Sequence, residues 1–154
     1  MIEQLLDLLS GRREPELQRQ DDIRLSVAAL LVEAARMDSV FGADERCTIE
    51  TLLAEKFHLE PQAVDALVED AQRKMACSTQ YFPFTHEICT RFSREERVEV
   101  IEMLWTVAYA DGVLDPEEDM LIRQIAGLIH VPDRERMLAR QRALAKLAAA
   151  KPTN

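Results

Sequence analysis

The residues best suited to chemistry are a run of carboxylates in the second half of the chain. Five of them fall within nine positions: Asp111, Asp115, Glu117, Glu118 and Asp119. Hard cations such as Ca²⁺ and Mg²⁺ prefer clustered oxygen ligands, so a cation site is one interpretation of this run. The run is not an EF-hand loop, because the sixth position counted from Asp111 is Pro116, where that loop needs glycine.

The same carboxylates also fit the start of a helix. Asp115 is a suitable N-cap, Pro116 suits the first helical position, and Glu118 completes a capping pair with Asp115. The helix dipole favours Glu117 at this position as well. Capping alone and a weak cation site both remain open at this point. A second acidic turn close by would favour the cation, because close carboxylates repel unless a cation or protons compensate.

A second acidic turn occurs in the sequence, 73 residues earlier. Residues 30–38 align with residues 103–111, and the alignment continues into the segment that follows, where the first copy has Asp44. Each copy keeps an Asp and a Glu seven positions apart, as Asp38 with Glu45 and Asp111 with Glu118. A helix–loop–helix unit of this kind cannot bury its apolar face alone. We therefore expect the two copies to pack together about a pseudo-twofold axis.

The histidines give a weaker signal. Glu55 and His58 form a Glu-x-x-His motif, of which di-iron bundles use two copies. Only one copy is present, because His130 has Gly127 three residues before it. The alignment pairs His58 with His130, with one residue deleted. We predict that both lie at equivalent helix ends, where a protonated imidazole interacts favourably with the helix dipole.

The elements that must position these turns are helices. The chain has 154 residues, only four glycines and 5% aromatic residues, and it is rich in Ala, Leu, Glu and Arg, which are good helix formers. Apolar residues recur at helical spacing, and no stretch of useful length alternates with period two. The sequence predicts an all-α fold, a compact bundle of seven or eight helices with two pseudo-symmetric helix–acidic loop–helix repeats.

Caps and apolar spacing predict where these helices lie. The expected helices cover residues 2–10, 22–37, 44–57, 61–77, 84–92, 93–110, 115–130 and 132–149. Gly11 is expected to end the first helix, and a polar linker with Pro15 follows it. We predict two parts: an N-terminal amphipathic helix and polar linker over residues 1–21, and a helical domain over residues 22–150. Cys47 is expected to face the core, and the cysteines in general to be reduced and mostly buried.

Composition excludes several functional classes. The chain has 19 Lys and Arg against 28 Asp and Glu, a net charge of −9, which argues against nucleic-acid binding and against strong attraction to anionic lipid. Three cysteines without a C-x-x-C pair argue against a disulfide framework or a structural zinc site. No apolar run is long enough to span a membrane, and the N-terminus lacks the basic region of a signal peptide. We expect a cytoplasmic protein.

Both ends of the chain carry a possible docking signal. Residues 134–151 hold six bases and one acid, so the last helix could bind an acidic partner or lipid, or could be a solvated face. Residues 2–10 place Ile2, Leu5, Leu6 and Leu9 on one side of a helix. That helix could dock on a membrane surface or a partner, or pack on its own domain. No hydrolase elbow, P-loop or dinucleotide-binding motif is present, so we expect a protein that is not an enzyme.

The acidic turns carry a resemblance to a known family. Residues 110–118 (ADGVLDPEE), followed by Leu121-Ile122-Arg123, resemble the signature loop of the TerB-like tellurite-resistance family. Residues 37–45 (MDSVFGADE) resemble its partner loop, and the resemblance covers about residues 22–140. The first copy departs from the pattern, because Ser39 replaces a glycine and Gly42 stands where the second copy has Asp115. The first loop is therefore poorer in carboxylates.

This resemblance implies a bacterial, cytoplasmic, all-helical domain with an acidic surface built from paired loops. It implies that Asp38, Glu45, Asp111 and Glu118 bind divalent cations, Ca²⁺ or Mg²⁺, and that the protein works in tellurite or general stress resistance beside membrane-bound partners. The full candidate metal set is Asp38, Asp44, Glu45, Asp111, Asp115, Glu117 and Glu118. The alternative is a co-chaperone-like interaction domain with a protein partner and no metal role. The sequence does not fix the oligomeric state.

Overall fold

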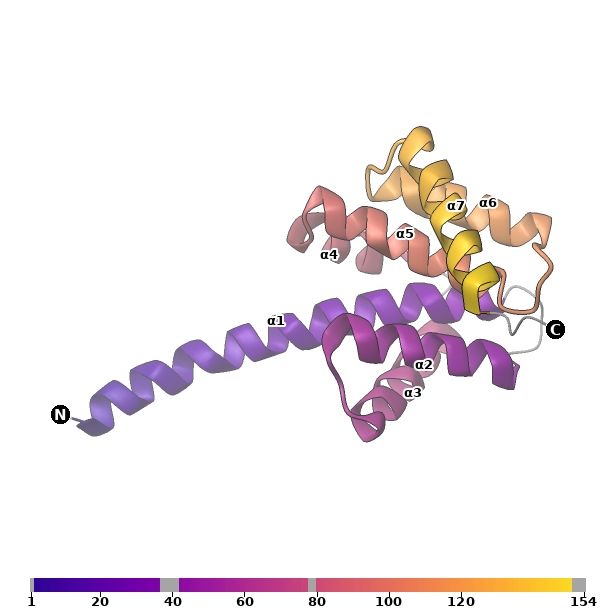
Figure 1. Ribbon diagram of the computed structural model, residues 1–154. Helices are drawn as coiled ribbons and strands as arrows, with labels where there is room; N and C mark the ends of the chain where they lie inside the picture. Colours follow the sequence, from indigo (N-terminus) through magenta and orange to yellow (C-terminus); the bar gives the residue numbers. More distant parts are fainter. Residues whose placement is uncertain (1, 37–41, 78–79, 151–154) are drawn as a thin grey trace.

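The computed structural model describes residues 2–36, 42–77 and 80–150, and for residues 3–15 it describes the backbone only. These ranges contain seven helices and no strand (Figure 1). The helices are α1 (Ile2–Arg36), α2 (Ala43–Phe57), α3 (Pro61–Cys77), α4 (Phe82–Arg91), α5 (Arg94–Ala108), α6 (Pro116–Leu128) and α7 (Asp133–Ala150). The predicted all-α fold is therefore confirmed, and most of the expected boundaries agree within two residues.

The helices form two similar units of three. In the first unit α1 packs against α2 and α3, and in the second α5 packs against α6 and α7. The two units meet where α1 contacts α5, and α4 links them by packing on α1 and α6 (Figure 1). This arrangement is what two helix–loop–helix repeats need in order to bury their apolar faces. The duplication itself stays a prediction.

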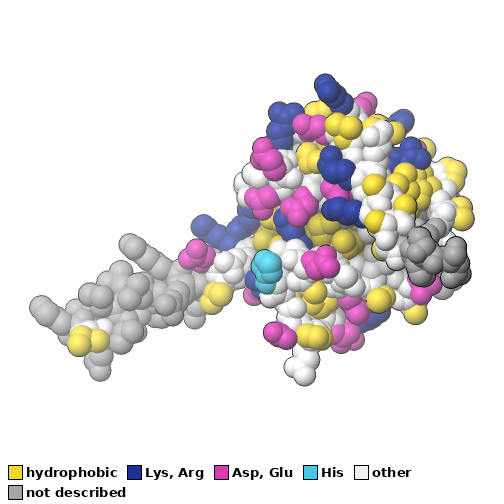
Figure 2. Space-filling model, in the orientation of Figure 1, with side chains coloured by type: hydrophobic (Ala, Val, Ile, Leu, Met, Phe, Trp, Pro, Cys, Tyr) yellow, Lys and Arg dark blue, Asp and Glu magenta, His cyan; other side chains and the backbone are white. Residues whose placement is uncertain are grey.

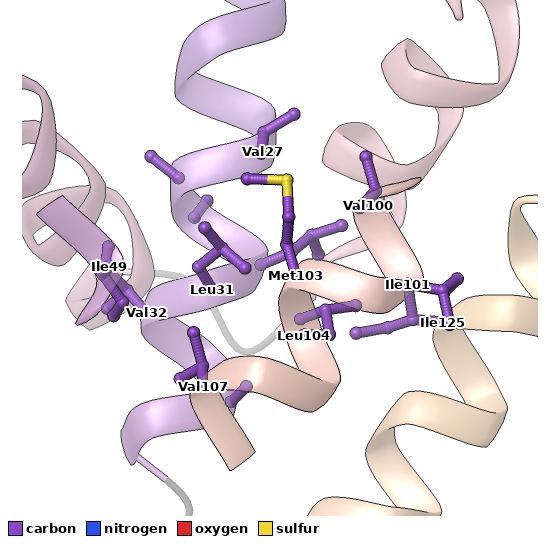
Figure 3. Packing of buried hydrophobic residues seen from close by; sticks show 14 of the residues in the cluster. Val27, Leu31, Val32, Ile49, Val100, Ile101, Met103, Leu104, Val107 and Ile125 are labelled. Carbon is purple, nitrogen blue, oxygen red and sulfur yellow. The ribbon is translucent and has the colours of Figure 1, made fainter. Parts of the chain in front are cut away.

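The core lies between the two central helices. Val27 and Leu31 of α1 lie close to Met103 and Leu104 of α5 in Figure 3, and α2 and α6 add further side chains from the flanks. Apart from Met103, which is 6% exposed, these four side chains are fully buried. Burying one such side chain contributes about 1.5–3 kcal/mol, so the contact between α1 and α5 is the main apolar support of both acidic turns.

The N-terminal segment differs from the prediction. We expected a break at Gly11 and a polar linker up to residue 21, but α1 continues without interruption from Ile2 to Arg36. A glycine costs only about 1 kcal/mol inside a helix, and a proline such as Pro15 can kink a helix without ending it. The Leu, Glu, Gln and Arg residues around them favour helix. The first part of α1 extends away from the other helices in Figure 1, while the boundary between segment and domain stays a prediction.

The cysteines also differ from the prediction. Cys47 and Cys77 are exposed and Cys89 is half-buried, so the expectation of mostly buried thiols is wrong. In α2 the buried positions are Ile49 and Leu53. Cys47 precedes Ile49 by two residues, which places it about 200° away around the helix. The inward orientation predicted for Cys47 is therefore wrong.

Candidate functional site

The two acidic turns lie at the same end of the molecule. The end of α1, the start of α2, the end of α5 and the start of α6 all point to one end in Figure 1. A shallow surface pocket is lined by Asp44 and Thr48 of α2 together with Thr106 of α5, so the start of α2 lies beside the last turn of α5. Asp38, the first carboxylate of the first turn, lies outside the described residues.

In the first turn a glutamate closes the start of α2. The N-cap residue is Gly42, which has no side chain to offer. The carboxylate of Glu45 takes over this role, because its Oε2 accepts a hydrogen bond of 2.7 Å from the backbone N–H of Gly42. Asp44 is exposed, and its backbone carbonyl accepts a hydrogen bond from the Thr48 hydroxyl at 2.9 Å. Glu45 is thus already engaged in a local structural bond.

In the second turn the chain reverses at a glycine. Gly112 has φ of 87°, a left-handed conformation that strongly favours glycine, and its N–H donates to the carbonyl of Tyr109 at 2.9 Å. Asp111 is exposed, and its Oδ1 accepts from the backbone N–H of Val113 at 3.1 Å. The turn therefore presents the Asp111 carboxylate at the surface with one of its two oxygens engaged.

The start of α6 is closed from the cap itself. Asp115 is the N-cap, its Oδ1 accepts from the backbone N–H of Glu117 at 2.9 Å, and Pro116 follows at the first helical position. The capping role predicted for Asp115 is confirmed. Glu117 is exposed, whereas Glu118 is only 3% exposed. Glu118 has an interaction partner in this buried position, which a carboxylate needs there.

The candidate ligands are arranged along the two helix starts rather than around a common point. Within residues 2–36, 42–77 and 80–150, no three His, Cys, Asp or Glu side chains come together as a group that could hold a metal ion. Asp38 lies outside these ranges, so the set that pairs it with Glu45, Asp111 and Glu118 stays a prediction. The described carboxylates share one end of the fold, and two of them, Glu45 and Asp115, cap helices.

The histidines occupy matching positions. His58 and His130 follow the ends of α2 and α6, and both adopt left-handed conformations with φ of 53° and 59°. After each of them the next residue closes the helix, with Leu59 N–H donating to the Ala54 carbonyl at 3.2 Å. Val131 N–H donates in the same way to the Ala126 carbonyl at 2.8 Å. The equivalent helix ends are confirmed, whereas Glu55 and His58 are exposed and do not point into a bundle core as di-iron ligands do.

A charged cluster that the sequence did not reveal fastens α7 to α5. Glu102 of α5 accepts hydrogen bonds from Arg142 Nε at 3.0 Å and from Lys146 Nζ at 2.7 Å, and its side chain is 13% exposed. Burial raises the pKa of Glu102, but the hydrogen bonds and positive charges of Lys146 and Arg142 outweigh burial and lower that pKa below its ordinary value. The only sequence signal was one acid within the apolar pattern of α5.

The basic residues of α7 gather on one side of the molecule. Lys and Arg side chains cluster over α7 and its flank in Figure 2. Arg140 lies over the rings of Trp105 and Tyr109 at 5.6 and 5.7 Å, and its Nε donates to the Tyr109 hydroxyl at 2.8 Å. Part of the predicted basic surface therefore packs within the domain. Among the described residues, no helix is both long and apolar enough to cross a membrane.

Comparison with known proteins supports the family resemblance. The model of the family described as "Tellurite resistance protein TerB" matches residues 24–141. The fold is similar to the crystal structure of a protein of unknown function from Porphyromonas gingivalis W83, with a TM-score of 0.60 and 17% sequence identity over 81% of this chain and 95% of that one. At this identity the likeness concerns the fold alone. No curated protein matches the chain.

Proposed function

The chain belongs to the TerB family, and from this premise we propose that it is a non-enzymatic binding or scaffold domain of a bacterial tellurite-resistance or stress-response system. We also propose that its paired acidic turns bind a divalent cation, Ca²⁺ or Mg²⁺, weakly. Its place is then the cytoplasm, either free or peripheral at the inner membrane, beside a protein partner.

The observation that carries the cation proposal is the convergence of the two turns at one end of the fold (Figure 1). Asp44 lies beside the end of α5, and the second turn begins three residues after Thr106. Asp111 and Glu117 add exposed carboxylates there. A cation that neutralises such charges binds the folded state and not the unfolded chain, so its binding stabilises the fold.

A thermal unfolding titration tests this proposal. For a dissociation constant of about 1 mM, about 10 mM Ca²⁺ or Mg²⁺ adds roughly 1.4 kcal/mol of stability, which raises Tm by roughly 3–6 °C in a domain of this size. Asp111→Asn removes one ligand charge and should abolish the rise. Asp21→Asn, at an exposed aspartate on α1, is the matched control and should leave the rise intact.

Two results would count against the cation. An unchanged Tm at about 10 mM cation excludes a site of useful affinity. An equal loss in Asp111→Asn and Asp21→Asn assigns the effect to general charge screening. Backbone NMR shifts during the same titration should move at residues 109–119 and 42–46 if the two turns act as one site.

The alternative function is a co-chaperone-like interaction domain without a metal role. The observation that favours it is the use of Glu45 and Asp115 as helix caps, which occupies two of the proposed ligands. Binding of a protein partner that does not change on addition of EDTA would support this function. Loss of that binding with EDTA, restored by Ca²⁺ or Mg²⁺, would support the cation-dependent one.

A further inference from the structure

One surface of the domain combines apolar and basic residues without a partner in the chain. We define the outer face of α7 as the exposed residues spaced along one side of this helix: Arg134, Leu138, Gln141, Ala145 and Ala148. Met137 and Leu144 border this face. Leu138 is 41% exposed, and Met137 and Leu144 are 39% and 38% exposed. Large apolar side chains grouped in this way are typical of a docking surface.

The outer face of α7 also has an excess of positive charge. Residues 134–150 hold five bases and one acid, in a chain with a net charge of −9. Arg142 and Lys146 share the single carboxylate of Glu102, so this cluster keeps a surplus positive charge. Arg140 bonds to the hydroxyl of Tyr109, which is a neutral group. A suitable occupant is therefore an amphipathic helix that carries acids.

The chain itself contains such a helix. Residues 2–10 include Glu3 and Asp7 and no base, and Ile2, Leu5, Leu6 and Leu9 recur at helical spacing. Their backbone is the first part of α1, which leaves the bundle (Figure 1). Ile2 is 77% exposed, and Leu17 further along α1 is 58% exposed. Because α1 is continuous up to Arg36 and buried in its second half, residues 2–10 cannot reach α7 of their own chain without breaking the helix.

We propose that residues 2–10 of one chain dock on the outer face of α7 of a second copy. The apolar side of the N-terminal helix then covers Leu138 and its neighbours, and Glu3 and Asp7 meet the basic residues that flank them, in a helix-on-helix mode of recognition. The dimensions agree, since at 1.5 Å per residue α7 is about 27 Å long and residues 2–20 span about 28 Å. An anionic lipid surface fits less well, because it repels Glu3 and Asp7.

Sedimentation of the full chain at rising concentration tests the proposal. A contact made by one short helix buries less than a standard interface, so the expected assembly is weak and appears at roughly 10–500 µM. The weight-average mass should rise from 17.6 kDa toward at least twice that value, and less so in high salt. A mass that stays at 17.6 kDa over this range overturns the proposal.

Matched leucine variants locate the surface. Leu138→Glu should abolish assembly, whereas Leu128→Glu should not, because Leu128 is 39% exposed but lies on α6 away from the outer face of α7. Circular dichroism checks that both variants keep their helical content. If Leu5→Glu abolishes assembly and Leu138→Glu leaves it intact, the N-terminal helices pair with each other and the proposal is wrong.

A charge exchange tests the specific pairing. Arg134→Glu and Asp7→Arg should each weaken assembly roughly tenfold, as expected when a charge at a contact is reversed. The double variant restores the attraction and should recover most of the affinity. Arg123→Glu, at an exposed arginine on α6, is the control and should have no such effect. Additive losses in the double variant would contradict the proposed contact.

Discussion

The two three-helix units use the same architecture with different local chemistry. In the unit α1–α3, the start of α2 is closed by Glu45 reaching back to the N–H of Gly42. In the unit α5–α7, the start of α6 is closed by Asp115 at the cap, and Glu118, the residue aligned with Glu45, is buried. The N-cap residue therefore decides what the later glutamate does. A glycine cap requires the glutamate, and an aspartate cap releases it for another role.

The units also differ in how their outer helices are held. The central helix of the second unit presents Trp105, whose indole N–H donates to the carbonyl of Arg136 in α7 at 3.1 Å, and Glu102, which binds two bases of α7. The aligned positions in the first unit are Val32 and Ala29, both fully buried and apolar. The second unit thus combines apolar packing with polar bonds, whereas the first relies on apolar packing at these positions.

Replacement of the central aligned pair should separate the two units most clearly. Trp105→Ala removes a large buried ring and its hydrogen bond and should lower the free energy of unfolding by about 3–5 kcal/mol. Val32→Ala removes two methyl groups and should cost about 1.5 kcal/mol. Urea denaturation measures both. Equal losses would show that the units do not differ in the way described.

The two aligned glutamates should also differ in effect. Glu118→Ala removes a buried carboxylate that has an interaction partner and should cost roughly 1–3 kcal/mol. Glu45→Ala removes a hydrogen bond near the surface and should cost roughly 0.5–1 kcal/mol. Glu95→Ala, at an exposed position in α5, is the control with a change within about 0.5 kcal/mol in either direction. A larger loss at Glu45 than at Glu118 would reverse the comparison.

The polar contact unique to the second unit should depend on pH. The pKa of Glu102 is lower in the folded state than its ordinary value of 4.5, so its contribution is complete above about pH 4.5 and fades as the pH falls through the folded-state pKa. Glu102→Gln should therefore destabilise the protein by about 1 kcal/mol at pH 7 and by less at pH 3. Urea unfolding at both pH values measures this difference. A difference that is independent of pH would contradict the role given to the charge.

The smallest effect is expected where the two units are most alike. His58 and His130 both adopt left-handed φ values, which cost a residue with a side chain about 1–2 kcal/mol. Glycine removes this strain but gains freedom in the unfolded chain, so His58→Gly and His130→Gly should each stabilise by about 0.5 kcal/mol. Gln141→Gly inside α7 is the control and should destabilise by about 1 kcal/mol. Opposite signs at the two histidines would argue against equivalent helix ends.

Much of the fold could be predicted because its signals are local. Ser93 and Glu96 form the expected capping box at the start of α5, and Asp115 caps α6. Apolar spacing placed Val27, Leu30 and Leu31 in the core correctly. Such signals depend on residues within one or two turns of each other, and tertiary contacts did not override them.

The features that could not be predicted depend on residues distant in sequence. The role of Glu102 requires Arg142 and Lys146, which lie about 40 residues away. The burial of Glu118 depends on how α6 sits against the rest of the fold, whereas a capping pattern predicts a surface role. Gly11 and Pro15 predicted a break that the structure does not have, because the preference of the surrounding residues for helix outweighed two unfavourable positions. The pairing that involves Asp38 remains a prediction.

The continuity of α1 has a consequence for local opening. Residues 16–22 are exposed, whereas Val27 to Val32 are buried, although both stretches belong to the same helix. Backbone amides in the exposed stretch can exchange with deuterium through fraying of an isolated helix, whose stability is marginal in water. Amides from Val27 to Val32 become accessible only when the whole domain opens. One helix should therefore span nearly the full range of exchange rates in this protein, and any ligand of its free half should be visible as slowed exchange there.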